Sequence, residues 1–219
     1  RQPLNRAAVN TVANSPFTSS DPVSELAVGE QLFEEMELGG TVNFIAFRQA
    51  VAGYNRIKEK NKPILTLIDF SKPSTEKRFF VFDMEKKKLL YSSVVAHGRN
   101  SGENYATSFS NQYGSYKSSL GFYLTENTYQ GGNGYSLILN GLEKGINDKA
   151  KARSIVVHGA PYANPSVAAS GRLGRSLGCP ALPTKLARPI INTIKDGSVM
   201  FIYANNPHYL AQSNILHKN

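Results

Sequence analysis

The 219-residue sequence contains one cysteine, Cys179, and no tryptophan. A single cysteine excludes an internal disulfide, and the chain has no CxxC, HxxxH or HExxH spacing of the kind that marks many metal sites. No stretch approaches the ~20 consecutive apolar residues that a membrane-spanning helix needs. These absences exclude a disulfide within the chain and a helical transmembrane segment in these 219 residues.

Acidic residues are the minority, with 16 Asp and Glu against 25 Lys and Arg, so the formal net charge is +9. The positive charge is dispersed, and its longest run, residues 86–88, is typical of a solvated hairpin turn. Because there is no RNP-like motif, zinc finger or basic helix, we expect no nucleic-acid partner. A carboxylate-rich polymer such as a bacterial cell wall suits this charge.

The chain begins with a polar segment and a helical segment. Residues 1–22 are rich in Asn, Ser and Pro, which predicts a flexible N-terminal segment. The chain opens at Arg1 and not at methionine, so we expect a mature or trimmed form, in which any signal peptide would no longer be visible. Residues 23–62 carry two amphipathic patterns, near 24–38 and 43–60, which predict a pair of helices ended by Pro63.

Residues 63–205 read mainly as β-structure. Strand patterns occur at 64–70, 78–83, 88–97, 120–125, 135–139, 154–158 and 198–203, and the second and third of these predict a hairpin. The apolar spacing within 184–194 predicts a helix that Gly197 stops. The expected class is therefore α+β: a predominantly β domain with an N-terminal helical pair, followed by a C-terminal tail at 206–219.

The single thiol lies in a tight bend downstream of a histidine. Cys179 stands between Gly178 and Pro180, and His158 ends the predicted strand 154–158. Such a bend leaves a sulfur reachable, and an imidazole at a nearby strand end can serve as its base. Two alternatives remain, an inert packed cysteine and a zinc site of Cys179, His158 and His97, for which no fourth ligand is evident.

The segments His158-Gly159 and Ser176-Leu-Gly-Cys-Pro-Ala181 resemble those of the bacterial peptidoglycan L,D-transpeptidases, the YkuD-like enzymes. The likeness spans about residues 63–204 and includes the blocks 94–102, 105–111, 118–123, 141–148 and 171–176. Two positions depart from the pattern of these enzymes. Leu177 stands where a second histidine is usual, and Ala181 where Asn or Arg is common.

The resemblance implies a YkuD-like catalytic domain with mixed sheets, acting without a cofactor. It implies that Cys179 attacks the bond between an L-centre and a D-residue in a peptidoglycan stem peptide, forming a thioester. An amine acceptor would give transpeptidation, whereas water would give L,D-carboxypeptidase trimming, and the residues do not separate the two. Because this substrate lies outside the inner membrane, a periplasmic or other extracytoplasmic location is expected.

The resemblance and the local chemistry also suggest supporting residues. The Gly159 carbonyl is expected to accept from the imidazole of His158, and the N–H groups of Gly178 and Cys179 to bind the oxyanion. Candidates for substrate binding are Arg172, Arg175, Ser176, His97 and Tyr162. Their alternatives are solvated loop charges for the arginines, a loop hydrogen bond for the serine, a strand-ending residue for the histidine and packing for the tyrosine.

Three rival interpretations follow from the same residues. In a sortase-like enzyme the cysteine ends a strand and a distal arginine follows, which the Gly-Cys-Pro bend disfavours. A papain-like protease places its cysteine ahead of its histidine, and the order here is reversed. A non-catalytic cell-wall-binding homologue predicts an unreactive thiol and stays open.

Overall fold

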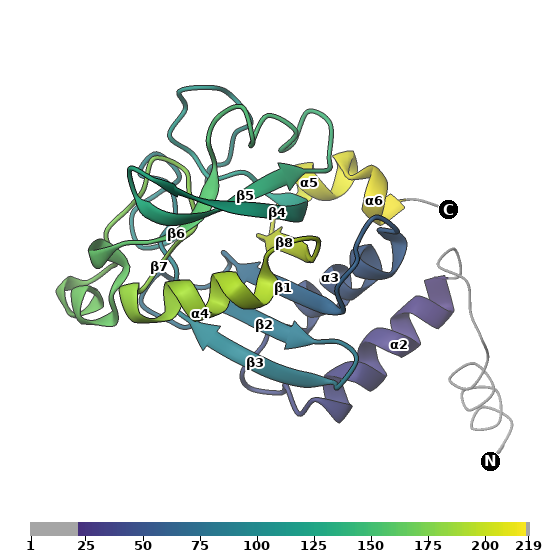
Figure 1. Ribbon diagram of the computed structural model, residues 1–219. Helices are drawn as coiled ribbons and strands as arrows, with labels where there is room; N and C mark the ends of the chain where they lie inside the picture. The colour runs from purple at the N-terminus through teal and green to yellow at the C-terminus, as the bar shows by residue number, and fades with distance from the viewer. Residues whose placement is uncertain (1–21, 218–219) are drawn as a thin grey trace, which may run out of the picture.

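The computed structural model describes residues 22–217 (Figure 1). Apart from Pro22, the segment predicted to be flexible at residues 1–22 lies outside the described residues. The predicted helical pair is present as α2 (Pro22–Glu35) and α3 (Phe44–Arg56). The Asn43 side chain caps α3 by accepting from the Ile45 and Ala46 amides at 2.9 and 3.3 Å, which satisfies N–H groups that have no partner within the helix.

Helix α3 is packed directly on the sheet. A Cβ atom added at Gly53 would lie 2.0 Å from Cζ of Phe122, so only glycine permits this approach. The ring of Phe47 meets that of Phe82 edge to face, with centroids 5.2 Å apart. Residues of α3 and of the strands therefore belong to one hydrophobic core.

Eight strands form one mixed sheet with the order β3-β2-β1-β8-β4-β5-β6-β7. The pairs β1/β8 and β6/β7 are parallel, and the other neighbours are antiparallel. The α+β class with a mixed sheet is thus confirmed, as is the hairpin of β2 and β3. The strands are β1 (Ile64–Asp69), β2 (Phe79–Asp83), β3 (Lys88–Ser93), β4 (Gly121–Gly131), β5 (Gly134–Gly141), β6 (Val156–Gly159), β7 (Ala181–Leu182) and β8 (Val199–Tyr203).

Strand β4 is longer than the pattern at residues 120–125 predicts. Its second half, Glu126 to Gly131, pairs with the start of β5 but is polar and mostly exposed. Without a buried face, this half lacks the alternation of apolar residues by which a strand is detected in sequence. The sequence therefore identified only the buried part of the hairpin.

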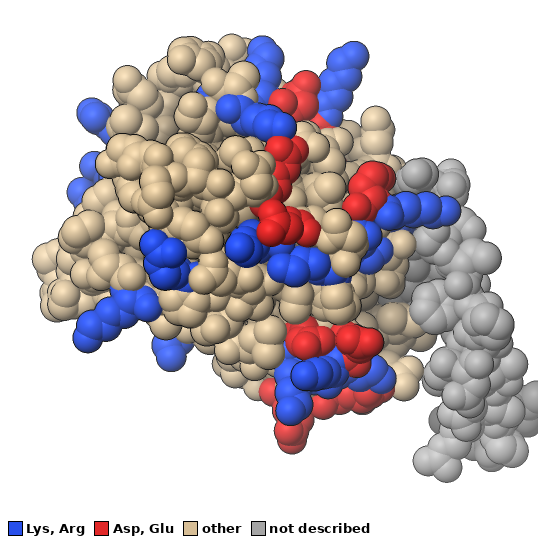
Figure 2. Space-filling view, in the orientation of Figure 1, with Lys and Arg blue, Asp and Glu red and all other residues tan. Residues whose placement is uncertain are grey.

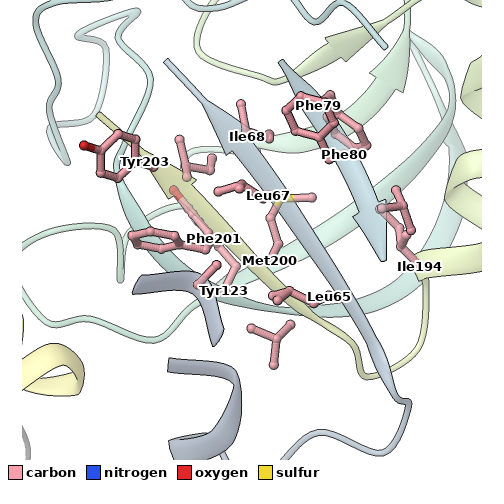
Figure 3. Close-up of a cluster of buried hydrophobic side chains, with 14 of the residues drawn as sticks. Leu65, Leu67, Ile68, Phe79, Phe80, Tyr123, Ile194, Met200, Phe201 and Tyr203 are labelled. Atoms are coloured by element: carbon pink, nitrogen blue, oxygen red, sulfur yellow. The ribbon is translucent and has the colours of Figure 1, made fainter. Parts of the chain in front are cut away.

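The centre of the core lies around β1 and β8 (Figure 3). Leu65 and Leu67 of β1 and Phe201 of β8 are fully buried. Each buried side chain of this size stabilises the fold by roughly 2 kcal/mol relative to an exposed one. This packing makes the sheet a rigid support for the loops at its ends.

The two edges of the sheet are joined through short bridges. Ala96, three residues after β3, pairs with Ala181 of β7, and Gly98 pairs with Ser176. Helix α4 (Thr184–Ile194) follows β7 and packs against β6, where a Cβ atom at Gly159 would lie 2.8 Å from Cβ of Ala187. In Figure 1, β6 and β7 lie at the left of the molecule, opposite α2, α3 and the C-terminal helices.

The region predicted as a C-terminal tail contains two short helices, α5 (Pro207–Gln212) and α6 (Asn214–His217). Glu143 anchors them, because its carboxylate accepts from the Tyr209 hydroxyl at 2.7 Å and from the Ser213 hydroxyl at 2.5 Å. Burial raises the pKa of this carboxyl, and its three hydrogen-bond donors oppose that shift. The tail is therefore tied to the core.

Lys and Arg side chains are scattered over the visible face, and several lie beside Asp or Glu (Figure 2). The dispersed distribution agrees with the sequence pattern and gives no basic stripe on that face. Among residues 22–217, no helix has the length and apolar character to cross a membrane.

Candidate functional site

Cys179 lies in a turn whose two ends are fixed to the same short segment. At one end, the Ser176 amide donates to the His97 carbonyl at 2.9 Å, and the Arg99 amide donates to the Ser176 carbonyl at 2.8 Å. At the other end, the Ala96 amide donates to the Ala181 carbonyl at 2.9 Å. The residues that connect the sheet edges thus also set the position of the thiol.

The thiol lies beside the start of β6, the strand that carries His158. His158 is paired in register with Ala181, and stepping back two residues on both strands sets Cys179 beside Val156. The Val156 amide donates to Sγ at 3.4 Å, and Sγ donates to the Ser154 carbonyl at 3.5 Å. Residues two apart on a strand point to the same face and lie about 7 Å apart. The side chains of Val156 and His158 therefore share a face of β6, whereas the thiol meets Val156 through the backbone amide, and within residues 22–217 no hydrogen bond joins Sγ to the imidazole.

The orientation of His158 is fixed by its neighbour. Nδ1 lies 2.9 Å from the Gly159 carbonyl oxygen, which is the contact expected from the sequence. Since a carbonyl only accepts, Nδ1 carries the proton and Nε2 of the neutral ring has a free lone pair. The buried imidazole is thus held in the tautomer that a general base requires.

Cys179 is only 9% exposed, less than the Gly-rich bend predicts. Burial raises the pKa of its thiol, while the hydrogen bond from the Val156 amide and the positive charge of Arg153 oppose this shift. The net direction is upward. At neutral pH the resting site therefore holds a neutral thiol.

Gly178 packs tightly next to the nucleophile candidate. Its φ is +127°, and an added Cβ would lie 2.8 Å from Cδ1 of Ile155 and 3.0 Å from the carbonyl oxygen of Lys117. Both the backbone conformation and the space therefore require glycine here. This close packing covers the turn and explains the low exposure of the thiol.

Ser176 holds the turn from inside. Its buried hydroxyl accepts from the Gly178 amide at 3.1 Å and donates to the Cys179 carbonyl at 2.6 Å. The Gly178 N–H, expected to bind an oxyanion, is thus engaged within the turn. No acceptor within residues 22–217 bonds the Cys179 N–H, which leaves this donor available. The loop hydrogen bond is the alternative that the geometry favours for Ser176.

Arg153 is a site residue that sequence reasoning missed. Its Nη1 donates to the Ser110 carbonyl and the Ser119 hydroxyl at 3.0 and 2.7 Å. Its Nη2 donates to the Ser115 hydroxyl and the Lys117 carbonyl at 3.1 and 2.8 Å. The guanidinium therefore holds residues 110–119 against the turn. The only sequence signal was a basic residue just before the strand that carries His158.

His97 has both ring nitrogens engaged. Arg78 Nη2 lies 2.8 Å from Nδ1, and because a guanidinium only donates, Nε2 carries the proton and donates to the Gly102 carbonyl at 3.1 Å. Burial and the charge of Arg78 lower the pKa of His97 to about 4. The geometry favours the structural alternative, in which this histidine fixes the start of the loop that follows it.

Arg172 and Arg175 converge on one carboxylate. Glu103, whose side chain is 77% exposed, accepts from Nε of Arg172 at 3.0 Å and lies 3.4 Å from Nη1 of Arg175. Nη1 of Arg175 also donates to the Arg99 carbonyl at 2.9 Å. Both arginines therefore already hold a carboxylate near the surface, in the loop before the thiol.

Tyr162 lies in the neighbourhood of the thiol. It packs on Gly174, where an added Cβ would come 2.4 Å from Cβ of the tyrosine. Burial and the proximity of Cys179, when that thiol is charged, raise the pKa of Tyr162 to about 12. Tyr162 thus packs on Gly174 and also lies close enough to Cys179 to interact with a charged thiol.

A hollow of about 230 Å³ opens beside the turn, lined by Tyr113, Gly114, Tyr116, Arg153 and Leu177. Leu177, one of the two departures from the family pattern, is 57% exposed there. Its neighbours Tyr113 and Tyr116 are also exposed. The surface next to the thiol is therefore apolar and aromatic at this point, with a cationic edge.

The part of the chain that the structure describes has no group of three or more His, Cys, Asp or Glu side chains arranged to hold a metal ion. His97 uses both of its ring nitrogens for protein contacts, which leaves the proposed zinc set of Cys179, His158 and His97 without that ligand.

Several solved structures of L,D-transpeptidases are similar to this chain at low identity. One from Mycobacterium smegmatis is 15% identical over 65% of this chain and 59% of its own, with a TM-score of 0.42. L,D-transpeptidase 3 from Mycobacterium tuberculosis is 14% identical over 64% and 61%, also with a TM-score of 0.42. One from Stackebrandtia nassauensis is 12% identical over 92% and 89%, with a TM-score of 0.38.

The match spans about 60% of the length of the first two of these structures. No individual curated protein matches the sequence. The family described as the L,D-transpeptidase catalytic domain matches residues 39–203, which is well over half of the 219 residues and includes α3 together with every strand. The resemblance found in the sequence is thereby confirmed, and the chain belongs to the L,D-transpeptidase catalytic domain family.

Proposed function

We propose that this chain is a peptidoglycan L,D-transpeptidase in which Cys179 is the nucleophile and His158 the general base. The observation that carries the proposal is the fixed turn that holds the thiol against the start of β6, the strand that also carries His158 with its ring oriented by the Gly159 carbonyl. Membership of the family supports transpeptidase chemistry in general. The residue roles rest on this geometry.

The raised pKa of the thiol favours proton transfer during attack over a stable thiolate–imidazolium pair. Nε2 of His158 takes the thiol proton while Sγ bonds to the carbonyl carbon next to the D-residue. As the tetrahedral intermediate collapses, the C–N bond breaks and His158 returns the proton to the leaving D-amino acid. The product of this half-reaction is a thioester on Cys179.

The second half-reaction reverses the roles. An acceptor amine loses a proton to His158 as it attacks the thioester, and the C–S bond breaks to regenerate the thiol. The new amide is a cross-link between two stem peptides. Water in place of the amine gives L,D-carboxypeptidase trimming with the same residues.

The developing oxyanion needs a hydrogen-bond donor that is already in position before the reaction. The Cys179 N–H, which has no acceptor within residues 22–217, is the donor that the geometry favours. A donor of this kind is typically worth about 3 kcal/mol of the barrier. Gly178 and Ser176 contribute by shaping the turn that presents this N–H. Gly159 contributes by fixing the imidazole.

We assign the carboxylates of the stem peptide to Arg172 and Arg175, because both already converge on the carboxylate of Glu103. We assign Tyr162 to the substrate-binding surface, because its hydroxyl is close enough to Cys179 to interact with the charge of the thiolate. His97 supports the site by anchoring the loop after β3. Since peptidoglycan lies outside the inner membrane, the proposed location is extracytoplasmic, in the periplasm or its equivalent.

The proposal is tested by incubating the protein with a tetrapeptide-containing muropeptide and analysing the products by mass spectrometry. Dimers support transpeptidation, whereas loss of one D-residue without dimers replaces it by carboxypeptidase activity. No change in either product, together with an unlabelled thiol after exposure to a carbapenem, would establish a non-catalytic wall-binding homologue. Turnover that survives in Cys179→Ala would remove the nucleophile assignment.

A further inference from the structure

A second concave surface is lined in part by residues 105–111, which belong to the same segment, 98–120, that contacts the turn of Cys179. Two adjacent hollows, of about 310 and 190 Å³, share Phe109 and Asn206 in their walls. One hollow lies where β1 and β8 end, bounded by Phe70 and by residues 204–206. The other extends toward α5 and includes His208 and Gln212. We call this surface the Phe109 groove.

The lining of the Phe109 groove carries no Lys, Arg, Asp or Glu. Charged residues make up 19% of the chain, so about three would be expected in a surface of this size. Aromatic rings, amides and hydroxyls take their place, including Tyr105, Phe109, Asn205, Gln212 and Thr107. This chemistry suits a neutral ligand with many hydroxyl groups and apolar faces.

Three side-chain amides of the groove have binding capacity left, whereas the hydroxyls of Thr107 and Tyr209 and the side chain of Asn111 already form hydrogen bonds within the protein. Asn206 uses its Oδ1 to cap α5 by accepting from the Tyr209 amide at 2.8 Å, and its Nδ2 remains as a donor. Within residues 22–217, the side-chain amides of Asn205 and Gln212 have no hydrogen-bond partner, and both residues are exposed. Tyr105 is half exposed, which presents an aromatic face at the rim.

The Phe109 groove and the turn that carries Cys179 are connected through one segment of the chain. Residues 98–120 supply Tyr105 and Phe109 to the groove, and the same segment contacts the nucleophile turn, where a Cβ at Gly98 would lie 3.1 Å from Cα of Gly178. The ring of Phe70, in the groove wall, lies 5.9 Å from the ring of His97. The segment 98–120 therefore takes part both in the groove and in the surroundings of the thiol.

We propose that the Phe109 groove binds the glycan part of the substrate, as a neutral N-acetylated oligosaccharide. The choice of a glycan from peptidoglycan rests on the proposed function, but the lining chemistry stands by itself. Sugar rings stack their apolar faces on aromatic side chains, and their hydroxyl and acetamido groups pair with amides. The absence of ionised groups in the walls avoids the cost of desolvating a charge against an uncharged ligand.

The test uses chitotetraose, an uncharged oligomer of N-acetylglucosamine, titrated into the full chain by isothermal calorimetry or NMR. Saturable binding is expected, with at least a 5-fold weaker affinity in Tyr105→Ala and in Asn205→Ala. Tyr129→Ala is the matched control, because Tyr129 is 41% exposed on the β4–β5 hairpin and lies outside the groove walls. Its affinity should equal that of the wild type.

Absence of binding, or an equal loss in Tyr129→Ala, would overturn the glycan assignment. A parallel assay with a sugar-free stem tetrapeptide separates the two proposals. Turnover of that peptide without chitotetraose binding would support the proposed enzymatic activity and contradict glycan binding by the Phe109 groove. If chitotetraose still binds to Cys179→Ala and the wild type turns over no peptide, glycan binding by the groove is supported and the proposed enzymatic activity is contradicted.

Discussion

Nη2 of Arg153 donates to the Lys117 carbonyl oxygen at 2.8 Å, and that oxygen lies 3.0 Å from the position a Cβ would take at Gly178. The guanidinium of Arg153 thus links three segments: the one that precedes β6, residues 110–119, and the turn that contains Gly178 and Cys179. Its four hydrogen bonds hold a cation close enough to Cys179 to oppose the rise of the thiol pKa. Arg153 is a positioning residue with an electrostatic effect on the thiol.

Replacing Arg153 by methionine should raise the thiol pKa further, because a neutral side chain leaves burial unopposed. The midpoint of the pH profile for iodoacetamide labelling should therefore move to higher pH. Arg153→Lys keeps the charge and loses most of the hydrogen bonds, so its midpoint should stay near that of the wild type. Equal midpoints in all three proteins would mean that the charge does not act on the thiol.

The sequence predicted most of the regular elements well, because their signals are local. Helix α4 was expected at 184–194 and occupies Thr184–Ile194, and the strand carrying His158 was recognised by its short apolar run. The Gly159 contact was also expected, since it involves adjacent residues. Signals of this kind need no knowledge of the tertiary fold.

The remaining features depend on contacts between distant parts of the chain. Arg153 bonds to residues 34 to 43 positions away, so nothing in its own neighbourhood predicts its role. The burial of the thiol follows from the same covering loop. The engagement of the Gly178 N–H by Ser176 is local, but it depends on a serine rotamer that a sequence does not specify.

Gly178→Ala should both destabilise the fold and slow any reaction at the thiol. A side chain at φ +127° with backbone oxygen 3.0 Å away costs on the order of 2 kcal/mol, and relief of the contact would shift the turn. Urea unfolding and the labelling rate of Cys179 measure the two effects. Gly39→Ala is the control, since no atom lies within 4 Å of its added Cβ and its φ is not positive. A Gly178→Ala protein with the stability and labelling rate of the control would contradict the prediction.

Glu103→Gln should strengthen binding of a stem peptide that has a free carboxylate. The substitution removes an internal carboxylate that competes for Arg172 and Arg175. Exposed ion pairs are worth at most about 1 kcal/mol, so the expected fall in KM is up to roughly 5-fold. Arg175→Met should raise KM for the same substrate. A KM that does not change in either variant would show that these arginines are solvated loop charges.

The stability of the protein should fall as the pH is lowered from 6.5 to about 4, with His97 as one cause. Its pKa is lowered to about 4 in the folded state because of burial and the charge of Arg78, whereas the unfolded chain titrates near its ordinary value of 6.5. Within that window the unfolded state binds more protons, so protonation favours unfolding, and the stabilisation present above pH 6.5 is lost progressively. The full loss is about 3 kcal/mol.

His97→Gln provides the matched comparison, because it contains every other titrating group and lacks this one. Its free energy of unfolding should be lower than that of the wild type at pH 7, and the gap should narrow steadily as the pH approaches 4. Urea denaturation at half-unit intervals measures the gap. A constant gap across the window would mean that His97 does not titrate between the two states, and that the contacts with Arg78 and Gly102 do not hold the ring neutral.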